Sequence, residues 1–143
     1  MSYETLGILT TQGKARIAQM LAFGKSYQIT HFVIGDAGHL PADPTIAITP
    51  DPAITDYVYG NVLIKPVGVV TFPFITCPQW TCVVEPGEYT GPVSALYLLG
   101  TVVYDPTAGS PDLGLRFIAA VATRPRSIQG PVDRYEFQVG IFL

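Results

Sequence analysis

Glycines and prolines divide most of this chain into short segments, and this spacing limits the folds it can adopt. The 143 residues include 14 glycines and 13 prolines. Because proline lacks a backbone N–H and glycine weakens regular structure, these residues mark strand ends and turns. About seven apolar or β-branched runs between them are predicted as strands: 27–35, 55–66, 67–76, 80–86, 93–105, 115–124 and 134–143. Gly100 interrupts the most apolar run and is expected at a bulge or a close-packing point.

One segment near the N-terminus has a helical pattern instead. Its apolar residues recur at helical spacing: Ile17, Ala18, Met20 and Leu21. Thr10 or Thr11 can cap the first amides, and Gly24 stands where a helix needs a left-handed residue. Lys25 is expected beside the exposed carbonyls at the helix end. These signals predict a helix over about 11–23.

The order of these elements predicts an α+β, mainly β fold. We expect a single domain over 1–143: a helix at about 11–23, then a β-rich region over 27–143. That region should form an antiparallel β-sandwich or open barrel of about seven strands. Three long loops, 36–56, 105–114 and 125–133, are predicted as docking arms. The apolar C-terminal "VGIFL" is expected to be paired in the sheet or buried at a subunit contact.

The low charge content points to a chain that buries part of its surface against other protein. Charged residues make up 13% and hydrophobic residues 48% of the sequence. The eight Lys and Arg residues, densest at Arg124 to Arg126, are too few for a nucleic-acid-binding face. Residues 1–9 lack the pattern of a signal peptide, and no apolar run is long enough to span a membrane. We therefore expect synthesis in the cytoplasm and neither nucleic acid nor membrane as a partner.

The stretch "ITHFVIGDAGHLPADP" at 29–44 holds His31, Asp36 and His39, which include both histidines of the chain. The three side chains could form a metal or catalytic site only if the loop curled back on itself. On a strand, His31 shares a face with Val33, and Asp36 follows the strand as a turn residue. The sequence favours a strand that runs into a turn.

Other residues of catalytic types lack the context that chemistry needs. Cys77 and Cys82 form at best half of a zinc site and are expected as buried free thiols, with a disulfide or metal as alternatives. Glu85 and Glu88 flank "PG", a turn signature. The serines weighed as nucleophiles lie outside any nucleophile elbow: Ser26, Ser94, Ser110 and Ser127. We predict no catalytic, cofactor-binding or metal-binding residue, no cofactor and no enzymatic activity.

Aromatic residues on a β-surface allow two interpretations. Sugars stack on aromatic faces, so a carbohydrate-binding platform is one. Burial in the core or in a subunit interface is the favoured one, because an aromatic side chain buries a large area at little entropic cost. The residues concerned are Trp80, Tyr57, Tyr59, Tyr89, Tyr97, Tyr104 and Tyr135.

The segment "GILTTQGKARIAQMLAFGKSYQITHFVIGDAG" resembles the N-terminal tail-collar domain of tail-fibre proteins of contractile-tailed bacteriophages. In that family a Leu-Thr pair precedes a short helix with a glycine near its start, and a segment ending in Gly-Asp then enters the sheet. The matching positions here are Leu9, Thr10, Gly13, Gly24, Ile29, Thr30, Gly35 and Asp36. The proline-rich stretch 40–67 also fits the family, whereas Ala37 stands where a second glycine is common.

The resemblance implies a structural virion protein of a phage tail that works in oligomers. Family members usually continue into a fibre shaft, whereas this chain ends at Leu143. We therefore expect a tail-fibre-connecting or baseplate-peripheral adaptor that forms a homo-oligomer or a multi-copy assembly. Its partners would be other virion proteins of the tail fibre, baseplate or tail tube. A capsid decoration protein and a carbohydrate-binding module remain as alternatives.

Overall fold

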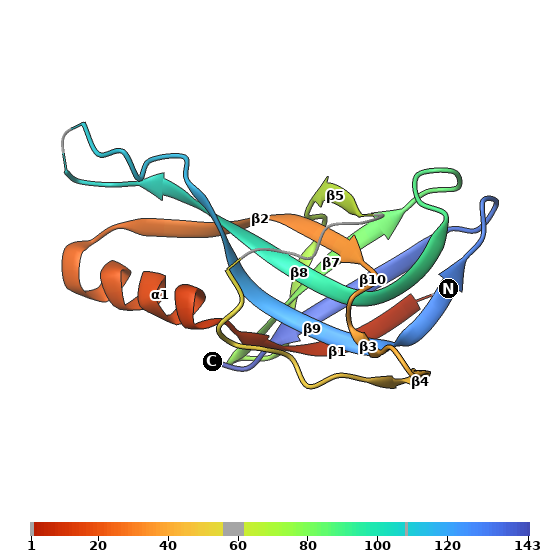
Figure 1. Ribbon diagram of the computed structural model, residues 1–143. Coiled ribbons are helices and arrows are strands. Elements are labelled where there is room, and N and C mark those ends of the chain that lie inside the picture. The colour runs from red at the N-terminus through yellow and green to blue at the C-terminus, as the bar shows by residue number, and fades with distance from the viewer. Residues whose placement is uncertain (1, 56–61, 108) are drawn as a thin grey trace.

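The computed structural model describes residues 2–55, 62–107 and 109–143, and most of its strands belong to one curled sheet (Figure 1). The eight strands of this sheet follow the order β5-β2-β8-β9-β1-β10-β7-β6. Their bounds are β1 Ser2–Leu9, β2 Ser26–Gly35, β5 Leu63–Pro66, β6 Val70–Phe74, β7 Cys77–Val84, β8 Gly91–Tyr104, β9 Arg116–Gln129 and β10 Tyr135–Ile141. A second, two-stranded sheet pairs β3 His39–Leu40 with β4 Asp43–Ala47.

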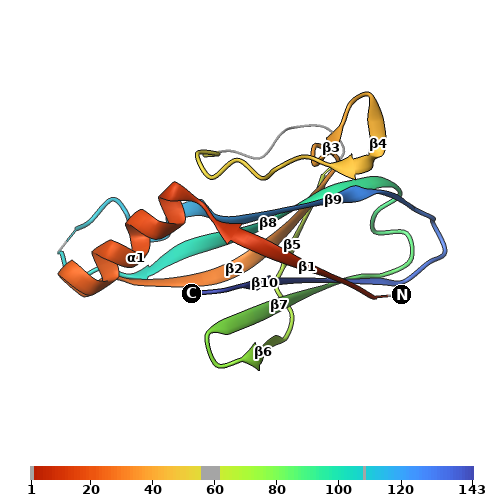
Figure 2. The ribbon, with the colours of Figure 1, turned by 90° about the horizontal axis from the view of Figure 1, so that it is seen from below.

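The sheet curls so that its two halves enclose one apolar core. Phe32 and Ile34 of β2 and Leu96 of β8 pack in the same cluster as Phe137 and Val139 of β10. Figure 2 shows the β10-β7-β6 half lying beneath the β2-β8-β9 half. The fold is thus mainly β with one helix, as predicted. Of the two predicted forms of the sheet, the sandwich is wrong, and the observed open half-barrel is close to the open barrel.

Within the eight-stranded sheet, the strand that the sequence analysis missed is β1, which raises the count of this sheet from about seven to eight. Its first residues pair with β10 in parallel, from Ser2 beside Glu136 to Gly7 beside Ile141. Its last two residues, Ile8 and Leu9, pair with β9 in the antiparallel sense. One strand therefore joins the two halves, and the predicted all-antiparallel arrangement is wrong at this point.

The connection between β5 and β6 spans the opening of the half-barrel. The Val67 amide donates to the Thr30 carbonyl of β2 (3.0 Å). The Gly68 amide donates to the Thr81 carbonyl of β7 (2.7 Å), and the Thr81 amide donates back to Val69 (3.0 Å). Residues 67–69 thus bridge strands from both halves of the sheet.

The single helix, α1, spans Thr11–Phe23, which confirms the predicted range. Thr10 caps it and has no exposed surface. The Thr10 hydroxyl accepts the Gly13 amide (2.9 Å) and donates to the Ile118 carbonyl of β9 (2.5 Å). Gly13 lies so close to β9 that a Cβ atom there would collide with the Ala119 carbonyl. The first turn of α1 is therefore fastened to the sheet by both residues.

The rest of α1 is less buried than its apolar pattern indicates. Gly13 is the buried residue of the helix, whereas Leu21 is 86% exposed and Phe23 is also exposed. Gly24 ends the helix with φ 71°, as predicted, and its amide donates to the Met20 carbonyl (3.1 Å). In the part of the chain that the structure describes, no helix is long and apolar enough to cross a membrane.

Two of the predicted loops are more ordered than expected. Within 36–56, strands β3 and β4 lie over the outer face of the sheet (Figure 2), and Ile54 packs against the cluster of Val33 and Tyr97. The predicted start of the loop 125–133 is wrong, because β9 continues to Gln129 and the loop begins after it. Part of the predicted strand 55–66, and with it Tyr57 and Tyr59, lies outside the described residues.

Replacing Thr10 with Val should lower the free energy of unfolding by about 1–3 kcal/mol, because a buried cap and its bond to β9 are both lost. Denaturant unfolding of the purified protein measures this difference. Thr11→Val, a neighbouring exposed position, is the matched control and should change stability by less than about 0.5 kcal/mol. An equal loss of stability in the two variants would contradict the stabilising role of the Thr10 hydroxyl.

Candidate docking surface

The loop after β2 does curl back, and it brings together two of the three residues considered for a metal site. The His39 Nδ1 atom lies 3.5 Å from an Asp36 carboxylate oxygen and 2.8 Å from the Ser94 hydroxyl. His31 stays apart and contacts the Thr30 hydroxyl (2.8 Å). Burial lowers the pKa of His31, and the charge of Arg116 adds to this. Within the described residues, no group of three or more His, Cys, Asp or Glu side chains could hold a metal ion.

Ser94, His39 and Asp36 are the residue types of a hydrolytic triad, but their geometry does not fit one. In a triad the serine and the aspartate contact different ring nitrogens, so that a proton can pass through the histidine. Here both side chains approach the same Nδ1 atom. Ser94 is fully buried, and its hydroxyl also accepts the Gly38 amide (2.9 Å). The cluster fixes the turn after β2, together with Arg126, whose Nε lies 3.7 Å from Asp36.

The remaining acids and thiols also have structural surroundings. Glu88 accepts from Lys65 (2.8 Å) and from the Glu85 amide (3.1 Å), and these two bonds lower its pKa. Cys77 and Cys82 are free and buried. Burial raises the pKa of Cys82 to about 11, which disfavours the reactive thiolate.

The aromatic residues weighed as a glycan platform are distributed over different environments. Tyr89, Tyr97 and Tyr135 are buried, and Trp80 is half-buried on β7. Trp80 lies at the wall of an apolar groove of about 180 Å³ at the open end of the half-barrel, beneath α1. Tyr104 is exposed at the end of β8. These side chains do not share one face of the sheet.

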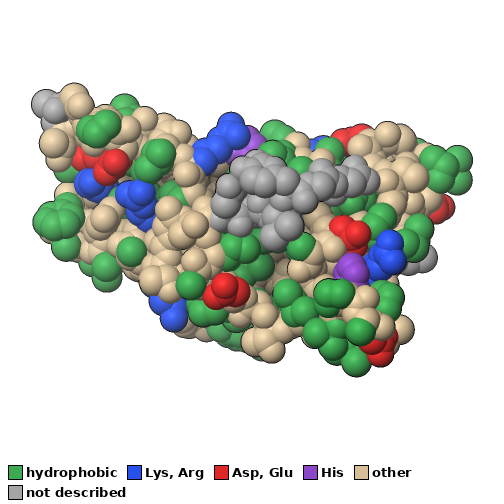
Figure 3. Space-filling model, in the orientation of Figure 1, with side chains coloured by type: hydrophobic (Ala, Val, Ile, Leu, Met, Phe, Trp, Pro, Cys, Tyr) green, Lys and Arg blue, Asp and Glu red, His purple; other side chains and the backbone are tan. Residues whose placement is uncertain are grey.

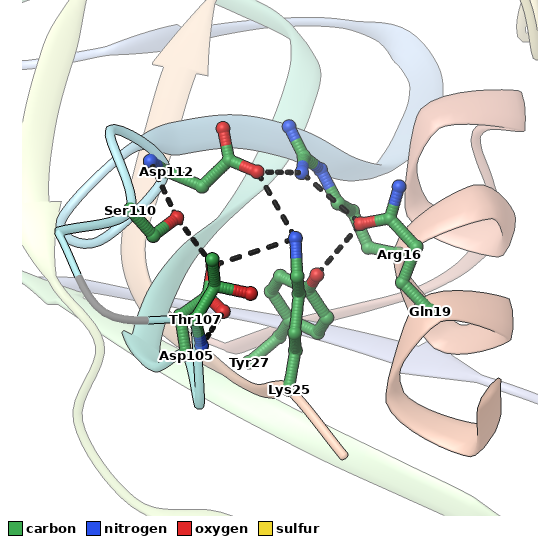
Figure 4. A network of polar contacts seen from close by, with 8 residues as sticks. All are labelled: Arg16, Gln19, Lys25, Tyr27, Asp105, Thr107, Ser110 and Asp112. Carbon is green, nitrogen blue, oxygen red and sulfur yellow. Dashed lines mark hydrogen bonds and ion pairs between the residues drawn. The ribbon is translucent and has the colours of Figure 1, made fainter. Parts of the chain in front are cut away.

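A polar network ties α1 to the loop 105–114 (Figure 4). The Lys25 ammonium lies 3.4 Å from Asp105 and 3.2 Å from Asp112. Lys25 was predicted to lie beside the carbonyls at the helix end, but its ion pairs are with this loop. Arg16 of α1 approaches Asp112 at 3.9 Å. The Arg16 guanidinium also lies over the rings of Tyr27 and Phe117, at 5.8 and 5.4 Å from their centroids. The loop is thus held against the helix and is not a free arm.

The pKa of Asp105 is lowered to about 2, chiefly by the bond from Ser110, then by the Thr107 amide and by Lys25. Because the folded pKa is depressed, the stabilisation is complete above the ordinary pKa of about 3.9 and is lost as pH falls through about 2. Wild type should therefore be more stable than Asp105→Asn above about pH 4. This difference should shrink as the pH falls towards 2, as measured by denaturant unfolding at a series of pH values. A constant difference across this range would contradict the assignment.

Exposed apolar side chains gather on the hairpin of β6 and β7 and on the adjacent C-terminus. All five residues of β6 are exposed, and Ile75 in the turn is 94% exposed. The rings of Phe74 and Phe142 contact each other with centroids 5.7 Å apart, and the Leu143 amide donates to the Thr76 carbonyl (2.9 Å). We call this surface the aromatic ridge, which consists of Phe72, Phe74, Ile75, Phe142 and Leu143.

The sequence analysis predicted a strand over 67–76 and noted the apolar C-terminal segment, but it did not predict that the two form one exposed apolar surface. It predicted strand 67–76 and expected "VGIFL" to be covered. β10 is indeed paired, between β1 and β7, yet Phe142 and Leu143 lie beyond it and are exposed. The available signal was the uncharged run "VVTFPFI", in which Thr71 is the single polar residue, because a half-buried strand normally alternates apolar with polar residues.

Comparison with known families agrees with the resemblance found in the sequence. Residues 1–56 match the family model described as phage tail-collar fibre protein, N-terminal. The predicted resemblance is confirmed over this segment, which contains β1, α1, β2 and the β3-β4 hairpin. No curated protein and no solved structure matches the chain. The chain is thus similar over its N-terminal 56 residues to a family of phage tail-fibre proteins.

Proposed function

We propose that this protein is a tail-fibre-connecting or baseplate-peripheral adaptor that works by docking onto other virion proteins. The observation that supports this most is the aromatic ridge, where large apolar side chains are exposed on and beside the paired hairpin of β6 and β7. The family match supports the location in a phage tail.

The composition of the ridge is that of an interface centre. Phenylalanine and isoleucine bury much apolar area for little conformational entropy, and charged residues are depleted at the centres of interfaces. Residues 69–76 carry no charged side chain at all. Covering the ridge would remove about 1.5–3 kcal/mol of unfavourable hydration for each large side chain that becomes fully buried. Part of that gain offsets the entropy lost on association.

The alternatives receive less support from the described residues. A carbohydrate-binding module needs aromatic faces that are open to a sugar, whereas Tyr89, Tyr97 and Tyr135 are buried. A capsid decoration protein would use a comparable apolar surface, so the location in the particle separates it from a tail adaptor. Imaging of virions that carry a tagged copy of this chain makes that distinction.

Replacing Ile75 with Asp should weaken binding to tail particles assembled without this chain by at least about tenfold, because a charge would be buried at the interface. Quantitative co-sedimentation with those particles measures the change. The matched control is Val132→Asp, since Val132 is also a β-branched apolar residue, is 80% exposed, and lies on the turn before β10.

The control variant should bind as wild type does. Both variants should unfold at the same denaturant concentration as wild type, since neither side chain is buried. Undiminished binding of Ile75→Asp, or wild-type protein located on the capsid, would refute the adaptor function.

A further inference from the structure

A pocket of about 240 Å³ lies beside the aromatic ridge, on the outer face of the sheet. Gly140 of β10 is paired with Leu6 of β1 on one side and with Gln79 of β7 on the other. Because glycine has no side chain, the space between these two neighbours stays open. Phe74 and Phe142 of the ridge form a further part of the wall. The ridge therefore continues into a concave site.

The wall of this pocket is mostly apolar but carries one carboxylate. Among the described residues that line it, Glu4 is the charged one, two positions before Leu6 on the same face of β1. The Phe74 and Phe142 rings contact each other with centroids 5.7 Å apart, so they present a continuous aromatic surface. Both rings and Leu6 are more than half exposed. A single anion thus stands beside aromatic and aliphatic groups that a partner can cover.

Glu4 has no ion-pair partner within the part of the chain that the structure describes. The strands β1, β6, β7 and β10 contain no lysine or arginine, and their other charged residue, Glu136, is also acidic. Several acids elsewhere are paired, for example Glu88 with Lys65 (2.8 Å). At two places on the face drawn in Figure 3, near its left and right ends, acidic and basic side chains lie next to each other. No cation of the described residues does the same for Glu4.

We propose that this pocket receives an arginine side chain of the virion protein that covers the aromatic ridge. The guanidinium group pairs with the Glu4 carboxylate and stacks on the exposed rings of Phe74 and Phe142, since it binds both carboxylates and aromatic faces. Its aliphatic stem packs on Leu6, as the stems of long cationic side chains do on apolar surface. The inference rests on the proposed docking through the ridge and names a side chain of the partner.

The acceptors at this pocket favour arginine over other side chains. An aliphatic side chain would cover Glu4 and leave its carboxylate without water or a cation, which is unfavourable. The Gln79 side-chain oxygen accepts from the Thr71 hydroxyl at 3.5 Å and has capacity for a second donor, while its amide nitrogen donates to Gln138 (3.4 Å). A guanidinium has several N–H donors in one plane and can serve both Glu4 and Gln79. A lysine ammonium is more strongly hydrated and has no flat face to stack.

Replacing Glu4 with Gln removes the charge and keeps the size of the side chain. This variant should bind tail particles assembled without this chain at least about fivefold more weakly than wild type, as measured by quantitative co-sedimentation. Raising the salt concentration should weaken binding of wild type more than that of Glu4→Gln, because the variant has no ion pair to screen. The matched control is Glu136→Gln, which makes the same change in charge on the same outer face but outside the pocket. It should bind within about twofold of wild type.

A titration of the isolated protein tests the pocket without a partner. N-acetyl-arginine methylamide should shift the backbone amide NMR signals of Gly140 and Gln79, with the millimolar affinity expected of one side chain. The citrulline derivative has nearly the same shape but no charge and should leave these signals in place. Glu4→Gln should lose the response to arginine, and circular dichroism should confirm that the variants are folded.

The results separate this proposal from the adaptor function. Normal particle binding by Glu4→Gln, while Ile75→Asp binds weakly, would overturn the arginine contact alone. Normal binding by both variants would overturn the adaptor function as well. A titration in which arginine produces no shift, or in which citrulline produces the same shift, would also rule out the arginine contact.

Discussion

The corner at Thr10 and Gly13 holds the two kinds of structure in this protein together. The Thr10 hydroxyl caps α1 and at the same time donates to β9, while Gly13 permits the helix to approach the Ala119 carbonyl. Immediately before this corner, Ile8 and Leu9 pair with β9, and the rest of β1 pairs with β10. A shift of this corner would misplace the strand that joins the two halves of the sheet. The hydrogen bonds of Thr10 therefore help to position β1 between the two halves of the sheet that enclose the core.

Much of the architecture could be predicted because local signals and tertiary structure agree. The Thr10 cap, the Gly24 terminus and the β-branched runs each favour the element that forms there. β1 could not be recognised in this way, since "SYETLGIL" has no strong alternation and pairs only with strands far along the sequence. The exposure of Leu21 was missed for a related reason: helical spacing of apolar residues does not reveal which face the core covers.

Two clusters of polar side chains in the described residues position the backbone. Asp36, His39 and Ser94 fix the turn after β2, and Lys25 joins α1 to the loop 105–114. The sequence could identify Asp36 as a turn residue, but the partnership of His39 with Ser94 spans 55 residues and needed the structure. The exposed apolar side chains of the aromatic ridge are therefore the surface that we expect a protein partner to contact. Because the backbone of β6 is already paired with β7, less backbone entropy is lost when a partner covers these side chains.

The bridge made by residues 67–69 has a consequence for how copies of this protein can meet. It connects the two outermost strands of the sheet, and each of these strands contains a proline, Pro66 in β5 and Pro73 in β6. A proline offers no N–H to an incoming strand, so backbone-driven stacking of one sheet on the next is disfavoured at both margins. Both margins of the sheet are thereby protected from edge-to-edge pairing with further strands. Attachment is left to side chains, which can be selective about their partner where a bare backbone cannot.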